Sequence, residues 1–241
     1  MRFLIVNDDG INAEGIKALA KWALQYGEVL VVAPKHEQSG KSHAIDFMNP
    51  IEIKRVAFLE GVEAWSMAST PADCVRFGIF GLHNKYDIVL SGINRGVNMS
   101  GDIIYSGTMG AIFEAGNQHH RGIAFSTTPE NLEGATKYLD MAFNYIMENN
   151  LFEYSDLYNV NIPEKVKGIK ITKQGDAYFS DAFYQVDETT YTQYGKMIAD
   201  TIKENDDTRP LTHAFCHFWD TPDYAELADK TFGQPADQPD F

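Results

Sequence analysis

The sequence predicts an α/β protein, built on a Rossmann-like, mostly parallel sheet with helices on both faces. Three observations favour this class. The 241 residues suffice for one large domain with a sizeable core, or for two small ones. In the first half, runs that are apolar throughout alternate with stretches of helical periodicity, which is typical of a covered parallel sheet. In the second half the alternation weakens and aromatic residues accumulate. This change predicts a smaller C-terminal extension of strands and helix that is used in oligomerisation.

Breaks in the apolar pattern mark the first elements. Arg2–Val6 is expected to be a buried strand, because a turn-forming Asn-Asp-Asp-Gly sequence ends its apolar run. Ala13–Gln25 has helical periodicity, and Gly27 follows as a stop signal. Glu28–Ala33 is a second run of buried-strand character. Two strands of lesser burial should follow, at Ile51–Val56 and Val62–Met67.

The middle of the chain continues the alternation of helices and strands. Thr70 is a helix cap followed by Pro71 in the first turn and Asp73 three residues after the cap, so a helix should run to about His83. The next apolar run predicts a strand at Tyr86–Leu90, ended by Ser-Gly. The remaining pattern predicts a helix at Thr108–Asn117, a strand at Gly122–Ser126 and a helix at Glu133–Asn149.

The last third of the chain has a weaker pattern. The expected elements are strands at Leu157–Ile162 and Ile169–Thr172, a weakly alternating segment at Tyr178–Val186 and a helix at Lys196–Glu204. From Thr221 the tail is acidic and contains proline, so we expect it to be poorly ordered by itself. We therefore predict a Rossmann-like catalytic domain over residues 1–165 and an extension of hairpin, helix and tail over residues 166–241 that does not fold independently.

Composition excludes several classes of partner. With 20 basic and 34 acidic side chains the net charge is −14, which argues against nucleic-acid backbones and anionic membranes. The chain begins directly with a strand pattern, without a signal-peptide pattern, and no apolar run approaches membrane-spanning length. Cys74 and Cys216 lack the spacing of a zinc or redox motif. We expect a cytoplasmic protein.

Asp8 and Asp9 are the most informative residues, because they stand side by side where the first strand ends. Two carboxylates held together away from water repel each other unless a cation neutralises them or one takes up a proton. The pair therefore indicates a metal ion. Asn-Asp-Asp-Gly is also good turn composition, and from these four residues alone the turn is the slightly better interpretation.

Other oxygen-bearing side chains follow strands in the same way. Ser39 and Gly40 lie in the segment after the second strand, and Asn94 follows the strand that ends near Leu90. Ligands of parallel sheets bind beyond the carboxyl ends of the strands, so these residues should cluster with Asp8 and Asp9. A donor set made only of oxygen favours magnesium, manganese or calcium over zinc.

Ser106, Gly107 and Thr108 precede or open the predicted helix at Thr108–Asn117. The first amides of a helix are unpaired and favour an anion, and hydroxyls with a glycine let a phosphate approach closely. An ordinary helix cap is the commoner meaning of Ser-Gly-Thr. The chain has neither a Walker loop nor a Gly-x-Gly-x-x-Gly sequence after the first strand.

Taken in order, these segments resemble the SurE family, the stationary-phase survival proteins that act as metal-dependent 5′-nucleotidases. The matching segments begin with residues 5–11, which include the Asp pair. The others are 31–34, 38–40, 43–45, 70–75, 87–98, 105–111 and 159–163. The resemblance implies that Asp8, Asp9, Ser39 and Asn94 bind one divalent ion, Mg²⁺ or Mn²⁺. It implies that the phosphate is held by Gly40, Asn98, Ser106, Gly107 and Thr108.

The resemblance also implies the reaction. The family hydrolyses nucleoside 5′-monophosphates and, in some members, 3′-monophosphates and short polyphosphate. Water would attack in line, with Asp8 or Asp9 as the general base. The alternative is a non-catalytic, metal-dependent nucleotide-binding module. His36 and His43 flank the Ser39 loop, but structural roles are expected for them, and Arg95 is equally suited to phosphate and to a carboxylate partner.

The resemblance implies a dimer or tetramer with parts of the C-terminal half exchanged. The sequence departs from the family pattern after about Thr172, so we predict a homodimer and leave the tetramer open. The aromatic residues of this region suggest burial against another subunit, and packing against the first domain is nearly as well supported. They are Tyr178, Phe179, Phe183, Tyr184, Tyr191 and Tyr194.

Overall fold

The computed structural model describes residues 1–173, 179–197 and 214–217. The strands along the chain are β1 (Arg2–Val6), β2 (Glu28–Pro34), β3 (Ile53–Val56), β4 (Glu63–Met67), β5 (Ile88–Arg95), β6 (Arg121–Thr127), β7 (Leu157–Ile162), β8 (Ile171–Lys173), β9 (Phe179–Gln185), β10 (Tyr191–Met197) and β11 (Ala214–His217). The helices are α1 (Glu14–Ala23), α2 (Pro71–Arg76), α3 (Gly107–Asn117), α4 (Leu132–Thr136) and α5 (Leu139–Glu148). Shorter turns are η1 (Phe77–Gly81), η2 (Ser100–Tyr105) and η3 (Leu151–Glu153).

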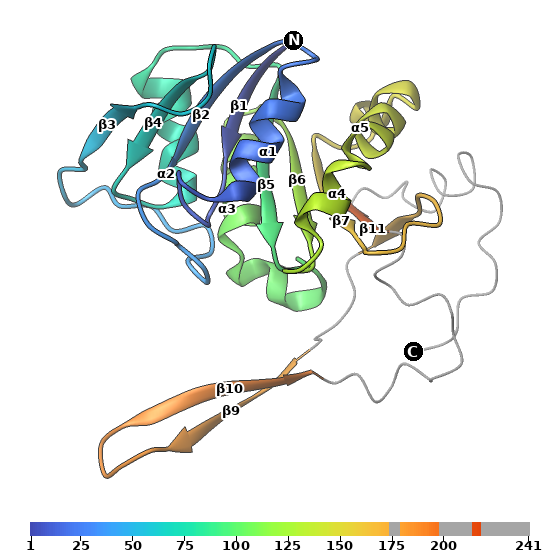
Figure 1. The fold of residues 1–241 in the computed structure, drawn as a ribbon. Coiled ribbons are helices and arrows are strands. Elements are labelled where there is room, and N and C mark those ends of the chain that lie inside the picture. Colours follow the sequence, from blue (N-terminus) through green and yellow to red (C-terminus); the bar gives the residue numbers. More distant parts are fainter. Residues whose placement is uncertain (174–178, 198–213, 218–241) are drawn as a thin grey trace.

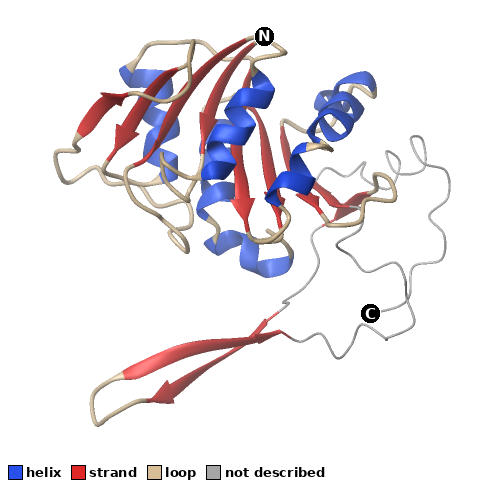
Figure 2. Cartoon of the chain, viewed as in Figure 1, coloured by secondary structure: helices blue, strands red, loops and turns tan. Residues whose placement is uncertain are grey.

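The described strands form a nine-stranded, mostly parallel sheet in the order β3-β4-β2-β1-β5-β6-β7-β11-β8, and a separate β9-β10 hairpin (Figures 1 and 2). β3 runs antiparallel to β4, and β11 runs antiparallel to β7 but parallel to β8. The predicted α/β class with a mostly parallel sheet is confirmed. The hairpin extends away from the main sheet (Figure 1).

Two hydrophobic cores cover the two faces of the sheet. Successive side chains of a strand point to opposite faces, and β1 follows this rule: Phe3 and Ile5 belong to one core, and Leu4 and Val6 to the other. The first core includes buried residues of α1 and α5, and the second includes buried residues of α2 and α3. All four β1 side chains named here are fully buried. β1 is therefore held rigidly from both faces up to the residue before Asn7.

Several predicted elements were wrong in detail. The strand expected to end at Leu90 continues to Arg95, because Ser91 and Gly92 pair with β6 as part of the strand. The helix expected over Glu133–Asn149 is divided into α4 and α5. The helix from Thr70 keeps its predicted cap, since the Thr70 side chain accepts a hydrogen bond from the Asp73 amide, but it passes into the π-helical turn η1 after Arg76.

The C-terminal predictions have mixed outcomes. Residues 179–185 of the weakly alternating segment form β9, but Lys196 and Met197, predicted as a helix start, belong to β10. Their backbones pair in register with residues 179 and 180 of β9. The remainder of that predicted helix and the tail from Thr221 lie outside the described residues. Phe183, Tyr184 and Tyr191 are exposed, so they do not pack against the first domain.

The topology locates one crevice at the carboxyl ends of the central strands. The chain continues from β1 to β2 on one side, and β5 lies on the other side of β1. Where the strand order reverses in this way, the loops that leave neighbouring strands diverge and leave a space for a ligand. Here the loops after β1, β2 and β5 meet, and these are the loops that carry the predicted site residues.

Candidate metal and phosphate site

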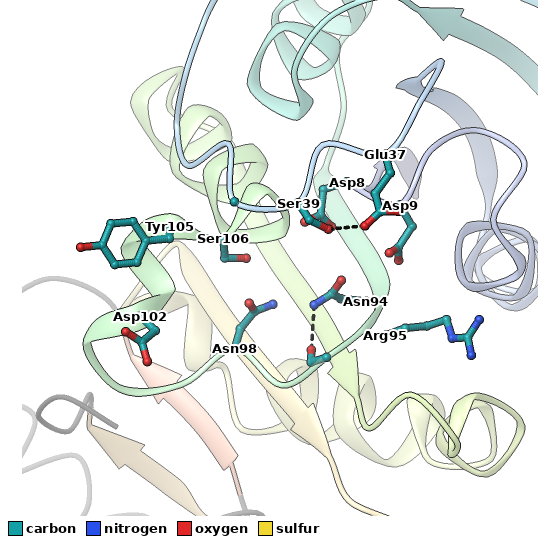
Figure 3. Close-up of a pocket in the computed structure, with 12 residues that line it drawn as sticks. Asp8, Asp9, Glu37, Ser39, Asn94, Arg95, Asn98, Asp102, Tyr105 and Ser106 are labelled. Carbon is teal, nitrogen blue, oxygen red and sulfur yellow. Dashed lines mark hydrogen bonds between the residues drawn. The ribbon is translucent and has the colours of Figure 1, made fainter. Parts of the chain in front are cut away.

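A pocket of about 330 Å³ lies at this switch point (Figure 3). Among the predicted site residues, its lining includes Asp8, Asp9, Ser39, Gly40, Asn94, Asn98 and Ser106. The other lining residues are Glu37, Arg95, Gly96, Asp102 and Tyr105. The structure thus brings together residues from four separate segments of the chain, 8–9, 37–40, 94–98 and 102–106. Gly107 and Thr108, also predicted to hold the phosphate, do not line the pocket; both lie against Asp8 instead.

Asp8 is 4% exposed and is held on two sides. The Thr108 hydroxyl donates to its Oδ1 at 2.5 Å, and its own carbonyl accepts from the Gln38 amide at 2.7 Å. Gly107 makes this approach possible, because a Cβ at that position would lie 2.7 Å from the Asp8 Cβ. Burial raises the pKa of Asp8, and the Thr108 hydrogen bond only partly opposes this. In the absence of a cation, a charge on this carboxylate is disfavoured.

Asp9 has less support from neighbouring groups. Its Oδ2 is buried and has no hydrogen-bond partner among the described residues. Burial, and then the charge of Asp8, raise the pKa of Asp9 to about 6, while the Arg95 backbone amide acts in the opposite direction. A buried carboxylate oxygen without a donor is costly in a folded protein. A cation bound between the two carboxylates would remove this cost.

Ser39 and Glu37 form a pair beside the two aspartates. The Ser39 hydroxyl donates to Glu37 Oε1 at 2.7 Å (Figure 3). Because its proton is directed at Glu37, the lone pairs of the Ser39 oxygen remain available. The Glu37 charge also contributes to the raised pKa values of Asp8 and Asp9. The sequence analysis assigned no role to Glu37, which the structure places in the lining of the pocket.

Asn94 enters the pocket from a bulge in β5. The register with β6 shifts between Gly92 and Asn94, and bulges of this kind redirect a side chain. The Asn94 Nδ2 donates to the Gly96 carbonyl at 2.7 Å, and its amide oxygen lies on the side of Ser39 and Asp8 (Figure 3). Arg95 points away, and its guanidinium donates to the Pro129 carbonyl at 3.2 and 3.3 Å.

Asn98 lies across the pocket in a neutral network. Its Nδ2 donates to the Ser126 hydroxyl at 2.8 Å, and its backbone amide donates to Asn161 Oδ1 at 2.8 Å. Its carbonyl accepts from the side chains of Asn159 at 2.7 Å and Asn161 at 2.8 Å. Asn98 is 7% exposed. Since an amide carries two N–H groups, one holds the side chain in place and the other is left for a ligand.

Ser106 caps α3 at the same side of the pocket. Its Oγ accepts from the Met109 amide at 3.1 Å, so its own hydroxyl proton is not used by the cap. The predicted cap is confirmed, and the same residue lines the pocket. The two interpretations of Ser-Gly-Thr are therefore compatible. His43 has a structural partner, as expected, because its Nε2 lies 2.7 Å from Glu114 Oε2.

The donor chemistry of this pocket fits a hard divalent cation. Two carboxylates, one hydroxyl and one amide oxygen, from Asp8, Asp9, Ser39 and Asn94, are the oxygen ligands that Mg²⁺ and Mn²⁺ select. Within the described part of the chain, no three His, Cys, Asp or Glu side chains gather as a metal-binding group. Only two of the four proposed donors, Asp8 and Asp9, belong to those residue types.

Fold and site together define an α/β protein with an acidic, oxygen-lined pocket at the switch point of a parallel sheet. The model of the family "Survival protein SurE" matches residues 3–181. The "5'-nucleotidase SurE" of Clostridium botulinum (strain ATCC 19397 / Type A) is 39% identical over 199 residues, which cover 78% of this chain and 79% of that relative. That of Trichodesmium erythraeum (strain IMS101) is 37% identical, covering 87% of this chain and 84% of that relative. This chain belongs to the SurE family.

A solved structure agrees with this assignment. The crystal structure of the SurE protein from Aquifex aeolicus is similar with a TM-score of 0.75 and 29% identity. The match covers 96% of this chain and 98% of that chain. The described residues also contain no helix that is long and apolar enough to cross a membrane.

Proposed function

We propose that the protein is a metal-dependent 5′-nucleotidase that hydrolyses nucleoside 5′-monophosphates to nucleoside and phosphate. The observation that carries this is the pair Asp8 and Asp9 at a strand end: Asp8 is buried, Asp9 is half-buried, and both line the same pocket as Asn98 and Ser106. The Asp9 Oδ2 is buried and has no hydrogen-bond partner among the described residues. The names of the curated relatives support the reaction. They do not favour the alternative of a binding module without turnover.

Asp8, Asp9, Ser39 and Asn94 would hold one divalent ion, Mg²⁺ or Mn²⁺. When bound, such an ion neutralises charge on the phosphoryl oxygens and lowers the pKa of water. Asp8 is fixed by Thr108 and Asn94 by Gly96, so two of the four ligands are oriented before an ion arrives. Ligands that are oriented in advance lose less entropy on binding.

The phosphate would lie between the acidic side of the pocket and Asn98. The second N–H of Asn98, the Ser106 hydroxyl and the open backbone at Gly40 are suited to phosphoryl oxygens. Gly107 and Thr108 lie in the first turn of α3. Their backbone amides would add to the positive end of the helix dipole, which favours the phosphate anion. One carboxylate of the Asp8–Asp9 pair would take the proton of the attacking water.

We also propose a homodimer that uses the C-terminal region. Phe183 is 68% exposed and Tyr191 is 56% exposed, and both lie on the same face of the β9-β10 hairpin, because Tyr191 pairs with Gln185, two residues after Phe183. Apolar groups gathered on one surface are typical of contact sites. Residues 1–165 and 166–241 would nevertheless fold as one unit, because β8 and β11 extend the main sheet. Light scattering at micromolar concentration tests this, and a monomer would contradict it.

The reaction is tested by phosphate release from a panel of 5′- and 3′-mononucleotides and short polyphosphate with Mg²⁺ or Mn²⁺. We expect turnover of 5′-monophosphates that stops when EDTA is added. Binding of a nucleotide and Mn²⁺ without phosphate release would favour the non-catalytic module. Phosphate release that persists in EDTA would contradict the metal requirement.

A further inference from the structure

Glu114 is a buried carboxylate outside the pocket. It lies on α3 and is 2% exposed. His43 Nε2 lies 2.7 Å from its Oε2, while Arg76 Nη1 and Gln118 Nε2 each donate to its Oε1 at 2.8 Å. Burial raises the pKa of Glu114, but the hydrogen bonds from its three partners outweigh this and leave the pKa below its ordinary value. The side chain is therefore an anion that is fully paired.

The partners of Glu114 come from different parts of the chain. Arg76 ends α2, and Gln118 follows α3. His43 belongs to the connection between β2 and β3, residues 35–52, which we term the Ser39 loop because it also carries Ser39 and Gly40. The imidazole thus links this loop to α3, the helix whose first turn supports Asp8.

The loop backbone lies directly on α3 around this link. A Cβ at Gly110 would lie 2.2 Å from the Ser42 carbonyl oxygen, so the glycine permits the close approach. The Ser42 amide donates to the Tyr105 carbonyl at 3.0 Å, and its hydroxyl donates to the Ile104 carbonyl at 2.5 Å. His43 lies four positions after Ser39 in the chain, so an anchor at His43 fixes the direction in which the loop crosses the pocket.

We infer that His43 and Glu114 are a positioning pair that docks the Ser39 loop on α3 and so places Ser39 and Gly40 over the pocket. Neither residue touches substrate. The expected effect of this pair on divalent-ion binding rests on the proposed function. The docking itself can be measured without metal or substrate.

A purely stabilising role of the pair makes a different prediction. Arg76 binds the same carboxylate from α2, and its guanidinium lies 5.5 Å from the centre of the Phe80 ring, so its side chain links Glu114 to α2 and η1 and not to the Ser39 loop. If Glu114 only stabilises the fold, loss of Arg76 and loss of His43 should have the same kinds of effect. If the pair positions the loop, only the loss of His43 should disturb the pocket.

The experiment compares His43→Ala and His43→Gln with the matched control Arg76→Met. Hydrogen exchange of the metal-free proteins reports on the loop through the amides of Lys41, Ser42 and Ala44, which are hydrogen-bonded in the structure. We expect exchange of these amides to accelerate roughly tenfold or more in His43→Ala, because their local opening becomes easier. We expect no acceleration in Arg76→Met, and protection restored in His43→Gln, whose amide can donate to Glu114.

Mn²⁺ titration calorimetry gives the second measurement. His43→Ala should bind Mn²⁺ about tenfold more weakly. Loss of a residue that orients a metal ligand typically lowers metal affinity by about tenfold to a hundredfold. Arg76→Met should stay within about twofold of the unsubstituted protein even if its melting temperature falls further, since it leaves the loop in place. Unchanged loop exchange in His43→Ala, or equal losses of Mn²⁺ affinity in both variants, would overturn the inference. If the unsubstituted protein binds no Mn²⁺, the proposed function fails, while the exchange data still decide whether the loop is docked by His43.

Discussion

The two sides of the pocket differ in charge and in how completely their polar groups are hydrogen-bonded. On the acidic side, Asp8 and Asp9 have raised pKa values, and Asp9 Oδ2 has no hydrogen-bond partner among the described residues. On the neutral side, both backbone groups of Asn98 are paired with asparagine side chains of β7, and its Nδ2 is paired with β6. The acidic side is incomplete without a cation, whereas the neutral side is already assembled.

This difference separates two kinds of contribution to the same site. Two carboxylates that repel each other lower the stability of the metal-free fold. A bound cation removes this repulsion, so the repulsion increases the affinity for the cation. A closed network of neutral groups has little affinity for a cation but holds a donor in one place. Substitutions on the acidic side should therefore change metal affinity, and those on the neutral side should change phosphate binding and fold stability.

The largest effect is expected for Asp8→Asn. The substitution removes one of the two charged ligands, so Mn²⁺ binding should be lost and turnover should fall by about 10²–10³-fold or more. The fold should remain intact, because an asparagine can still accept the Thr108 hydroxyl. Titration calorimetry and phosphate release measure both quantities, and circular dichroism checks the fold. Activity like that of the unsubstituted protein would remove Asp8 from the site.

The next largest effects are expected for Ser106→Ala and Thr108→Ala. Both residues lie at the start of α3, but Ser106 faces the pocket and Thr108 contacts the acidic side at Asp8. Each loses one hydrogen bond to a charged group, worth about 1.5–3 kcal/mol, or roughly tenfold to a hundredfold in kcat/KM. The Ser106 hydroxyl faces the pocket, so Ser106→Ala should leave Mn²⁺ affinity unchanged. The Thr108 hydroxyl contacts Asp8, so Thr108→Ala should also weaken Mn²⁺. Unchanged kcat/KM in both would show that this helix end does not face the phosphate.

Asn161→Ala tests whether the neutral side acts through a preassembled donor. The substitution leaves the buried Asn98 amide without its acceptor, which should destabilise the fold by about 1–3 kcal/mol. Denaturant unfolding measures this change. Because Asn98 then loses its fixed position, KM should rise while Mn²⁺ affinity is retained. A fall in Mn²⁺ affinity equal to the rise in KM would show that the two sides are not separable.

The sequence predicted the acidic side better than the neutral side, for a physical reason. Asp8, Asp9 and Asn94 follow apolar runs, so their position at strand ends was visible locally. Asn159 and Asn161 alternate on β7 like a solvated strand face, yet both are buried, and their partner Asn98 is more than sixty residues away in the chain. The family resemblance included these residues, but the pattern alone assigned them no role.

Long-range pairing also explains the errors in the fold. β11 inserts between β7 and β8 from a segment more than forty residues further along the chain, and no local pattern specifies such an insertion. The sequence predicts that Ser91 and Gly92 end the strand, but in the structure Ser91 is fully buried and pairs with Val6 of β1 and Ala124 of β6. Neighbouring strands override local composition at the centre of a sheet.

The smallest effect is a change of stability with pH in the metal-free protein, tested with Asp9→Asn. The pKa of Asp9 is raised from 3.8 to about 6. Between these values the folded state holds a proton that the unfolded state has released, so its contribution to stability is present at low pH and is lost as pH rises through about 6. Asp9→Asn should therefore raise the free energy of unfolding at pH 8 by about 1–2 kcal/mol, after allowance for solvent at the pocket mouth, and should change it little at pH 4. Urea unfolding in EDTA at both pH values measures the difference.

With saturating Mn²⁺, Asp9→Asn should instead be less stable than the unsubstituted protein, because only the unsubstituted protein gains the full binding energy of the ion. An Asp9→Asn protein that is less stable than the unsubstituted protein in EDTA at pH 8 would show that the acidic side is not the strained half of the pocket.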